Sequence, residues 1–181
     1  MATATTGLTI DEFEQLPDAL AHNHELVDGE LIDVSGNTGG HNKLRDGMMA
    51  MLYAHVHQHR LGLLLAEQEF EFGENAHGPD ISFLGPSKAK SFDNELRVQR
   101  FVPDLAIEVA SKSERFEALF AKALRYRKFG TKEGWIFSIV TRQAFVFSEA
   151  GPPLVLVESQ EFQSPLIPGF SIRLSDLFAM I

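Results

Sequence analysis

The sequence lacks cysteine, and this absence excludes structural disulfides, thiolate metal ligands and cysteine nucleophiles. It also fits a reducing compartment. No run of apolar residues approaches about 18, so we expect no membrane-spanning helix and no membrane partner. The opening segment MATATTGLTIDEF contains neither a basic stretch nor an apolar one. We therefore expect no signal peptide and a cytoplasmic location.

Positive charge is also scarce. The chain has 16 Lys and Arg residues against 25 Asp and Glu residues, which gives a net charge of −9. Phosphate binding needs concentrated Lys and Arg, so this balance opposes a nucleic-acid function unless basic residues cluster locally. Between positions 112 and 132, seven basic residues accompany only two acidic ones. The basic residues are Lys112, Arg115, Lys122, Arg125, Arg127, Lys128 and Lys132.

The remaining composition is that of an ordinary globular protein. Of the 181 residues, 44% are hydrophobic and 23% are charged, which opposes intrinsic disorder. We see no internal repeat, no low-complexity tract and no linker that divides the chain. We interpret residues 1–181 as a single domain, because this length is sufficient for one hydrophobic core.

The stretch Phe101–Ser111, FVPDLAIEVAS, predicts a central strand. Apolar and small residues occupy both of its faces, a pattern typical of a strand that is covered on both sides. Glu108 is the exception. Because an isolated buried carboxylate is costly, Glu108 should face a partner, a cleft or a metal ion. An ion pair with an arginine at a strand end is the purely structural alternative.

The other segments predict a mixed α/β architecture. Asp28-Gly29 between two apolar runs indicates a hairpin, and Thr9 with Glu12 forms a capping box. Strand, helix and strand from Leu105 to Val140 make a β-α-β crossover, whereas the preceding strands have no helices between them. We therefore predict a mixed sheet with an N-terminal hairpin and flanking helices. We expect helices at His41–Arg60 (closed by Gly62), Ser113–Phe129 (N-cap Ser111 or Ser113) and Leu174–Met180. We expect strands at Leu63–Phe72, Ile81–Leu84, Gly134–Val140, Ala144–Ser148 and Leu154–Val157. A turn is expected at 73–79, and a loop with a marginal helix at 87–100.

Two acidic residues suggest a metal site. Asp80 lies in Pro79-Asp80-Ile81, at the mouth of the strand before the central one. If these strands are neighbours, Asp80 and Glu108 project toward the same point. Paired carboxylates with a backbone carbonyl suit Mg²⁺ or Mn²⁺, and Mg²⁺ also keeps waters and substrate phosphate oxygens. The pair therefore points to phosphodiester chemistry.

Lys122 is a candidate for the third group of such a site. It lies on the flank of the apolar stripe of the helix that follows the central strand, from where its long side chain could reach Glu108. An ammonium group near a metal-bound water would position the nucleophile and stabilise charge developing on the phosphate. The alternative is an ordinary solvated lysine, since most lysines are exposed.

These residues resemble a known group of nucleases. Their order resembles the pattern of the PD-(D/E)xK superfamily: a Pro-Asp pair, then an acid in an apolar strand, then a lysine. In that superfamily the lysine usually stands two residues after the second acid, a position that Ala110 occupies here. The wider pattern resembles the large bacterial Uma-two family of restriction endonucleases, over nearly the whole chain. The segments that carry this resemblance are Thr9–Phe13, Leu16-Pro17, Glu25–Leu31, His41, Pro79–Phe83, Pro103–Ser111, Lys122 with Tyr126, Gly130, Trp135 and Pro168–Phe170.

The resemblance implies a restriction-endonuclease-like fold and a magnesium-dependent endonuclease that acts on DNA. It implies that Asp80 and Glu108 are metal ligands and that Lys122 is a catalytic lysine that has migrated onto the following helix. Glu25 would be an additional catalytic acid, and His41 would contact phosphate. From the residues alone, Glu25 could equally be an exposed hairpin residue and His41 a surface residue at a helix start.

The sequence departs from the family at two places. Gly134 stands where a tyrosine is usual, and His77-Gly78 occupies a position that often holds an arginine. A competing hypothesis is a catalytically inactive nuclease-like domain that binds nucleic acid or protein. A third possibility is a scaffold homodimer with a vestigial site, in which the apolar segment Leu154–Val157 and Phe170 pack across a two-fold axis. Cleavage of both DNA strands would also need two sites, so we expect a homodimer.

Three histidines in one helix, His55, His57 and His59, suggest a zinc site at first sight. Of these, only His55 and His59, four residues apart, share a helix face, and no carboxylate lies at ligand spacing, so we disfavour zinc. The chain also has no phosphate-binding glycine loop and no serine-nucleophile motif.

Overall fold

The computed structural model describes residues 7–34, 37–110, 116–149 and 151–181. Its helices are α1 (Ile10–Glu14), α2 (Asp18–Ala21), α3 (Gly39–His59), α4 (Pro86–Lys90), α5 (Phe116–Lys128) and α6 (Leu174–Phe178). Its strands are β1 (His24–Val27), β2 (Glu30–Asp33), β3 (Leu63–Ala66), β4 (Glu69–Phe72), β5 (Asn75–His77), β6 (Ile81–Leu84), β7 (Val98–Gln99), β8 (Leu105–Ala110), β9 (Glu133–Ser138), β10 (Gln143–Ser148), β11 (Leu154–Val157), β12 (Glu161–Gln163) and β13 (Ser171–Arg173).

A six-stranded mixed sheet forms the centre of the molecule, in the order β11-β10-β9-β8-β6-β3. Strand β8 runs parallel to β9 and antiparallel to β6. All six residues of β8 are buried, as the alternation on both of its faces predicted. The β8-α5-β9 crossover is confirmed, and so is the mixed α and β architecture.

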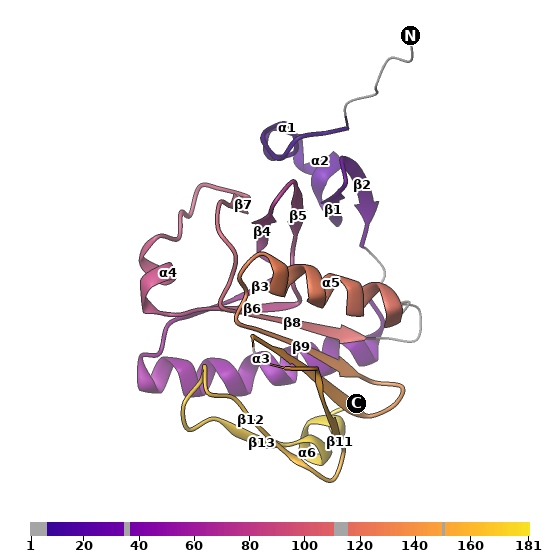
Figure 1. Cartoon of the computed structure of the whole chain (residues 1–181), viewed down its shortest axis with the longest axis vertical. Helices are drawn as coiled ribbons and strands as arrows, with labels where there is room; N and C mark the ends of the chain where they lie inside the picture. Colours follow the sequence, from indigo (N-terminus) through magenta and orange to yellow (C-terminus); the bar gives the residue numbers. More distant parts are fainter. Residues whose placement is uncertain (1–6, 35–36, 111–115, 150) are drawn as a thin grey trace.

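Helices α3 and α5 cover opposite faces of this sheet (Figure 1). On the α3 side, Ile107 and Val109 of β8 belong to the largest hydrophobic cluster, together with the buried stripe of the helix. On the α5 side, Ala110 packs with Leu119 and Ala123. Glu108 lies between Ile107 and Val109 in the strand, so its side chain points to the opposite face, toward α5. The stripe of α3 consists of Leu44, Met48, Leu52 and Val56.

A five-stranded N-terminal sheet, built from strands within residues 24–99 in the order β2-β1-β5-β4-β7, lies above the central sheet (Figure 1). The predicted hairpin joins β1 to β2, and its turn residues Asp28 and Gly29 have φ values of 50° and 83°. The predicted capping box is present: the Thr9 side chain accepts from the backbone of Glu12, whose carboxylate in turn accepts from the backbone of Thr9.

The predicted strand Leu63–Phe72 is wrong, because the segment forms two strands in two different sheets. Glu67 has φ of 53°, which breaks the extended backbone between β3 and β4. Strand β3 then pairs with β6, whereas β4 pairs with β5 and β7. At this break the chain passes from the edge strand of the central sheet into the N-terminal sheet.

Other predicted boundaries also need correction. The turn expected at 73–79 contains β5. The segment 87–100, expected to be a loop with a marginal helix, contains the short helix α4 and also β7. The short strands β5 and β7 lack apolar alternation and form through pairing with β4. Helix α3 is closed by Arg60, which has φ of 53°, and not by Gly62. Strand β12 was not predicted from the sequence. The proposed N-caps Ser111 and Ser113 lie outside the described residues.

No helix in the described part of the chain combines the length and apolar character required to cross a membrane.

Candidate active site

The register of the central sheet places the two predicted acids next to each other. Ile81 of β6 pairs with Ile107 of β8 in antiparallel register, so the preceding residue, Asp80, lies beside Glu108. The Oδ2 atom of Asp80 accepts a hydrogen bond from the backbone N–H of Val109 at 2.7 Å. Both carboxylates are buried. The neighbouring strands that the sequence analysis assumed are therefore present.

Lys122 completes the cluster from α5. Its Nζ atom lies 3.0 Å from Oε1 of Glu108 and 2.8 Å from Oε1 of Glu25. The Lys122 side chain is only 16% exposed, so the alternative of a solvated lysine is wrong. One turn further along α5, the Tyr126 hydroxyl donates a hydrogen bond of 2.6 Å to Oε1 of Glu108. Helical spacing of four residues explains why both side chains reach the same carboxylate.

Glu25 on β1 is buried at the same site and is not an exposed hairpin residue. Its Oε1 atom accepts from Lys122 and, at 2.9 Å, from the backbone N–H of Gly78. Its Oε2 atom lies 2.9 Å from Nδ1 of His77. The carboxylate is thus held by three groups from two other segments of the chain.

His41 lies in the first turn of α3 and is also buried, which contradicts the alternative of a surface histidine. Its Nε2 atom is 3.1 Å from Oδ2 of Asp80. This contact links the start of α3 to the metal-ligand candidate. The phosphate contact expected for His41 stays a prediction.

Burial and neighbouring charges shift the pKa values of this cluster in opposite directions. Burial raises the pKa of Glu108 to about 7; the ammonium of Lys122 opposes this, and the nearby carboxylates of Asp80 and Glu25 add to it. Burial would also raise the pKa of Glu25, but the charge of Lys122 and the hydrogen bond from His77 outweigh it and lower the pKa to about 2. Burial disfavours the charged form of Lys122, yet Glu108 and Glu25 raise its pKa above the usual value.

The cluster lines a cavity of about 810 Å³ between α3, β1 and the central sheet. Its lining is rich in acids. The lining contains six carboxylate side chains but only three Lys or Arg side chains, so an anionic substrate would meet a net negative surface there. The acids are Asp18, Glu25, Glu67, Glu69, Asp80 and Glu108, and the basic residues are Arg45, Arg97 and Lys122.

Two residues, one in the lining of this cavity and one behind it, were not predicted to take part. Glu69 on β4 lines it, and its Oε2 atom is buried without a hydrogen-bond partner among the described residues. His77 on β5 holds Glu25. Glu69 lies two residues after the break at Glu67, in a segment that we expected to be one continuous strand. In the sequence, only one feature pointed to His77: the pair His77-Gly78 stands where the family often has an arginine.

The described residues contain no group of three or more His, Asp or Glu side chains that could hold a metal ion. A divalent ion at the acidic cluster would therefore rest on two carboxylates, with waters or substrate oxygens as its other ligands.

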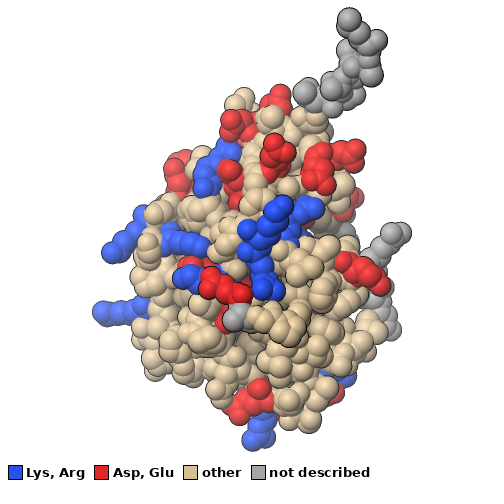
Figure 2. Space-filling model, viewed as in Figure 1, with Lys and Arg blue, Asp and Glu red and all other residues tan. Residues whose placement is uncertain are grey.

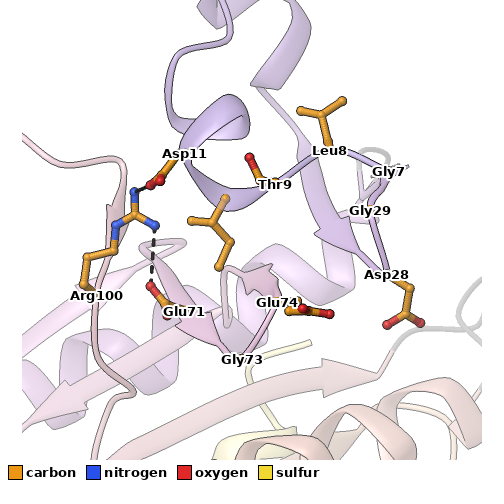
Figure 3. A pocket seen from close by; sticks show the side chains of 11 residues that line it. Gly7, Leu8, Thr9, Asp11, Asp28, Gly29, Glu71, Gly73, Glu74 and Arg100 are labelled. Atoms are coloured by element: carbon orange, nitrogen blue, oxygen red, sulfur yellow. Dashed lines mark hydrogen bonds and ion pairs between the residues drawn. The ribbon is translucent and has the colours of Figure 1, made fainter. Parts of the chain in front are cut away.

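A second cavity, of about 790 Å³, lies between α1, the β1–β2 turn and the turn after β4 (Figure 3). Arg100 spans one side of it, with contacts of 2.7 Å to Asp11 and 3.5 Å to Glu71. None of the predicted site residues lines this cavity.

The fold is of the restriction-endonuclease-like type, with a mixed central sheet, flanking helices and an acidic cluster where β6 meets β8. The chain belongs to the Uma2 family, whose model carries the description "Putative restriction endonuclease" and matches residues 10–175. A similar solved structure is described as "a putative nuclease belonging to DUF820" from Anabaena variabilis ATCC 29413. It is 22% identical, with a TM-score of 0.85, and the match covers 96% of this chain and 98% of that chain. A search of curated proteins finds no match.

Proposed function

We propose that this protein is a metal-dependent endonuclease that hydrolyses phosphodiester bonds in DNA. One observation carries the proposal: Asp80, Glu108 and Lys122, which are far apart in the sequence, meet in one polar cavity. Two carboxylates beside one ammonium group are the side chains that metal-assisted phosphoryl chemistry requires. Membership of a family described as restriction endonucleases supports the same reaction.

The donor set fits a hard divalent cation. Asp80 and Glu108 offer carboxylate oxygens in a cavity with an excess of negative charge. The raised pKa of Glu108 has the same origin, since burial and two neighbouring carboxylates disfavour its ionised form. We assign Mg²⁺ or Mn²⁺ to these two residues, because such ions accept few protein ligands and keep several waters. The ion would lower the pKa of a bound water and offset phosphate charge.

Lys122 is the residue that acts on the substrate. Its ammonium group is held between Glu108 and Glu25, which keeps it charged and fixes its position beside the metal-ligand candidates. There it orients the attacking water and stabilises negative charge on the phosphate oxygens. Glu25 is the assisting acid: its pKa of about 2 keeps it ionised, so it holds Lys122 and does not donate a proton at neutral pH.

His41 orients Asp80 through their 3.1 Å contact, and Val109 N–H holds the same oxygen from the other side. Two fixed donors limit the rotation of the Asp80 carboxylate, which prepares it for metal binding. In the proposed complex, His41 also lies close enough to the cavity to contact a substrate phosphate.

The distribution of surface charge is compatible with DNA. Figure 2 shows Lys and Arg side chains over the α5 region, whereas Asp and Glu gather on the N-terminal part at the top. The last turn of α5 contains Arg125, Arg127 and Lys128. This local excess can attract phosphates although the net charge of the chain is −9.

The proposal is tested with three single variants, Asp80→Asn, Glu108→Gln and Lys122→Met, assayed for Mn²⁺-dependent nicking of plasmid DNA. Each is expected to lower the rate by about 100-fold or more, because each removes a metal ligand or the charge beside the phosphate. Glu117→Gln, an exposed residue on α5, is the matched control and should cleave at the wild-type rate. Cleavage by all three variants at the wild-type rate would refute the mechanism.

A second candidate is a nuclease-like homodimer that binds nucleic acid or protein without cutting. The acidic lining of the cavity favours it over cleavage, because the lining would repel a phosphate that enters the site. Calorimetric titration with Mn²⁺, followed by DNA binding measured over a range of salt, separates the two. Metal binding with cleavage supports the endonuclease. Salt-dependent DNA binding without cleavage supports the binding protein.

A further inference from the structure

His77 occupies a buried position behind the cluster. Its side chain is enclosed by the rings of Phe72 and Tyr126, with ring centroids 5.7 and 5.8 Å away, and the residue is 2% exposed. Its Nδ1 atom is 2.9 Å from Oε2 of Glu25, and its Nε2 atom is 3.0 Å from Nη1 of Arg125. One ring nitrogen therefore contacts a carboxylate, and the other contacts a guanidinium group.

These partners determine the tautomer of His77. An arginine nitrogen can only donate, so Nε2 of His77 must accept and carries no proton. The single ring proton then lies on Nδ1 and is donated to Glu25. Arg125 is itself held in place, because the same Nη1 atom lies 3.3 Å from Oδ1 of Asn75, which also accepts from the backbone N–H of Asp28 at 2.8 Å.

The hydrogen bonds continue from His77 to the proposed catalytic lysine. Glu25 uses Oε2 for His77 and Oε1 for Lys122, so rotation of the carboxylate would break both contacts together. The N–H of Gly78 adds a second donor to Oε1. Lys122 has only one other carboxylate partner in the described residues, Glu108. The position of the ammonium group thus depends on the orientation of Glu25.

We propose that His77 is a positioning residue, which holds the Glu25 carboxylate and through it keeps Lys122 at the reacting phosphate. The role rests on the proposed nuclease function. It extends that function to a residue that does not touch the substrate, in the way that outer hydrogen bonds orient the groups of a metal site.

The two amide variants of His77 test this role, because each retains one of its contacts. In His77→Asn the amide lies near the position of Nδ1 and can still donate to Glu25, whereas in His77→Gln it lies near Nε2 and reaches Arg125 instead. We expect His77→Gln to lower kcat by about 10-fold or more with KM within about 2-fold, as for loss of an outer-shell partner. His77→Asn should recover most of the wild-type kcat. Equal kcat losses in both variants would overturn the proposal.

A second readout does not depend on cleavage. Acetylation of Lys122 by acetic anhydride, followed by mass spectrometry, reports how firmly its amine is held. We expect faster acetylation in His77→Gln than in the wild type and His77→Asn. Wild-type acetylation rates in His77→Gln would refute the positioning role. If the wild type cleaves no DNA while acetylation rises as expected, the proposed nuclease function fails and the positioning of Lys122 stands.

A stability control accompanies both measurements. Phe162→Leu removes a buried ring that packs against Trp135 in the main hydrophobic cluster, on the opposite side of the sheet from α5. It should lower the melting temperature without changing kcat or the acetylation of Lys122. A kcat loss in Phe162→Leu equal to that of His77→Gln would assign the effect to stability and overturn the proposal.

Discussion

Glu69 is the residue whose environment departs most from what a carboxylate requires. It lines the acidic cavity, and its Oε2 atom is buried without a hydrogen-bond partner in the described part of the chain. Burial raises its pKa to about 7; Arg97 opposes the shift, and Glu25 and Glu14 increase it. Below pH 7 the side chain is therefore mainly neutral, and above pH 7 the folded protein contains a poorly compensated buried charge.

We predict that Glu69→Gln stabilises the protein in a pH-dependent way. The folded pKa of Glu69, about 7, lies above the value of 4.5 for an unperturbed glutamate, so its ionisation progressively favours unfolding between these two pH values. Thermal melts at pH 5 should be nearly equal for variant and wild type. At pH 8 the variant should gain about 1–2 kcal/mol, allowing for the partial exposure of the side chain. A gain of equal size at both pH values would contradict this explanation.

At the scale of elements, the approach of α5 to the central sheet decides whether Lys122 reaches Glu108. Two small residues meet at this contact. A Cβ atom added to Gly134 of β9 would lie 3.8 Å from the Cβ of Ala123 on α5 and 3.8 Å from that of Phe147 on β10. These are ordinary packing distances, so the site has room for one methyl group and little more.

We predict opposite effects for two glycine substitutions. Gly134→Ala should raise the free energy of unfolding by about 0.5–1 kcal/mol, since it restricts the unfolded chain without a clash. Gly62→Ala should lower the free energy of unfolding by about 1–3 kcal/mol. Gly62 precedes β3, and a Cβ atom there would lie 2.1 Å from the carbonyl oxygen of Leu84, the last residue of β6. Urea denaturation measures both. A destabilising Gly134→Ala would show that α5 packs more tightly on β9 than the structure indicates.

At the scale of the whole molecule, the outer edge of the central sheet is apolar. Strand β11 is the last strand of that sheet, and its residues Leu154, Val155 and Val157 are 55%, 46% and 44% exposed. An exposed apolar edge strand favours pairing with another chain. The structure contains one chain, so the homodimer expected from the sequence stays a prediction. Phe170, the other residue expected at its two-fold axis, is buried against the main cluster.

We expect Val155→Lys to reduce self-association if β11 forms a two-fold contact, because a charge at its centre opposes edge pairing. Light scattering or sedimentation should give a dimer for the wild type and a smaller average mass for the variant. Lys90, exposed on α4, provides the control through Lys90→Gln. A monomeric wild type at all accessible concentrations would reject the dimer.

Much of the candidate site could be predicted from particular residues. The alternation around Glu108 identified a buried strand with one acid, and the spacing of Lys122 on the next helix placed it on the correct flank. The split of 63–72 into β3 and β4 could not be predicted, because the reversal at Glu67 depends on pairing with two different sheets. Glu69 and the support for Glu25 were missed for the same reason.

The sequence by itself determined the types of side chain, the buried periodicity of β8 and α3, and the family, because these depend on local pattern and on the order of motifs. Only the tertiary structure decided which groups meet. Lys122 and Glu25 are 97 positions apart, and His77 and Glu25 are 52 apart, yet each pair is within hydrogen-bond distance. Such contacts arise from strand register and helix packing, which the competition among many long-range pairings selects and no local pattern encodes.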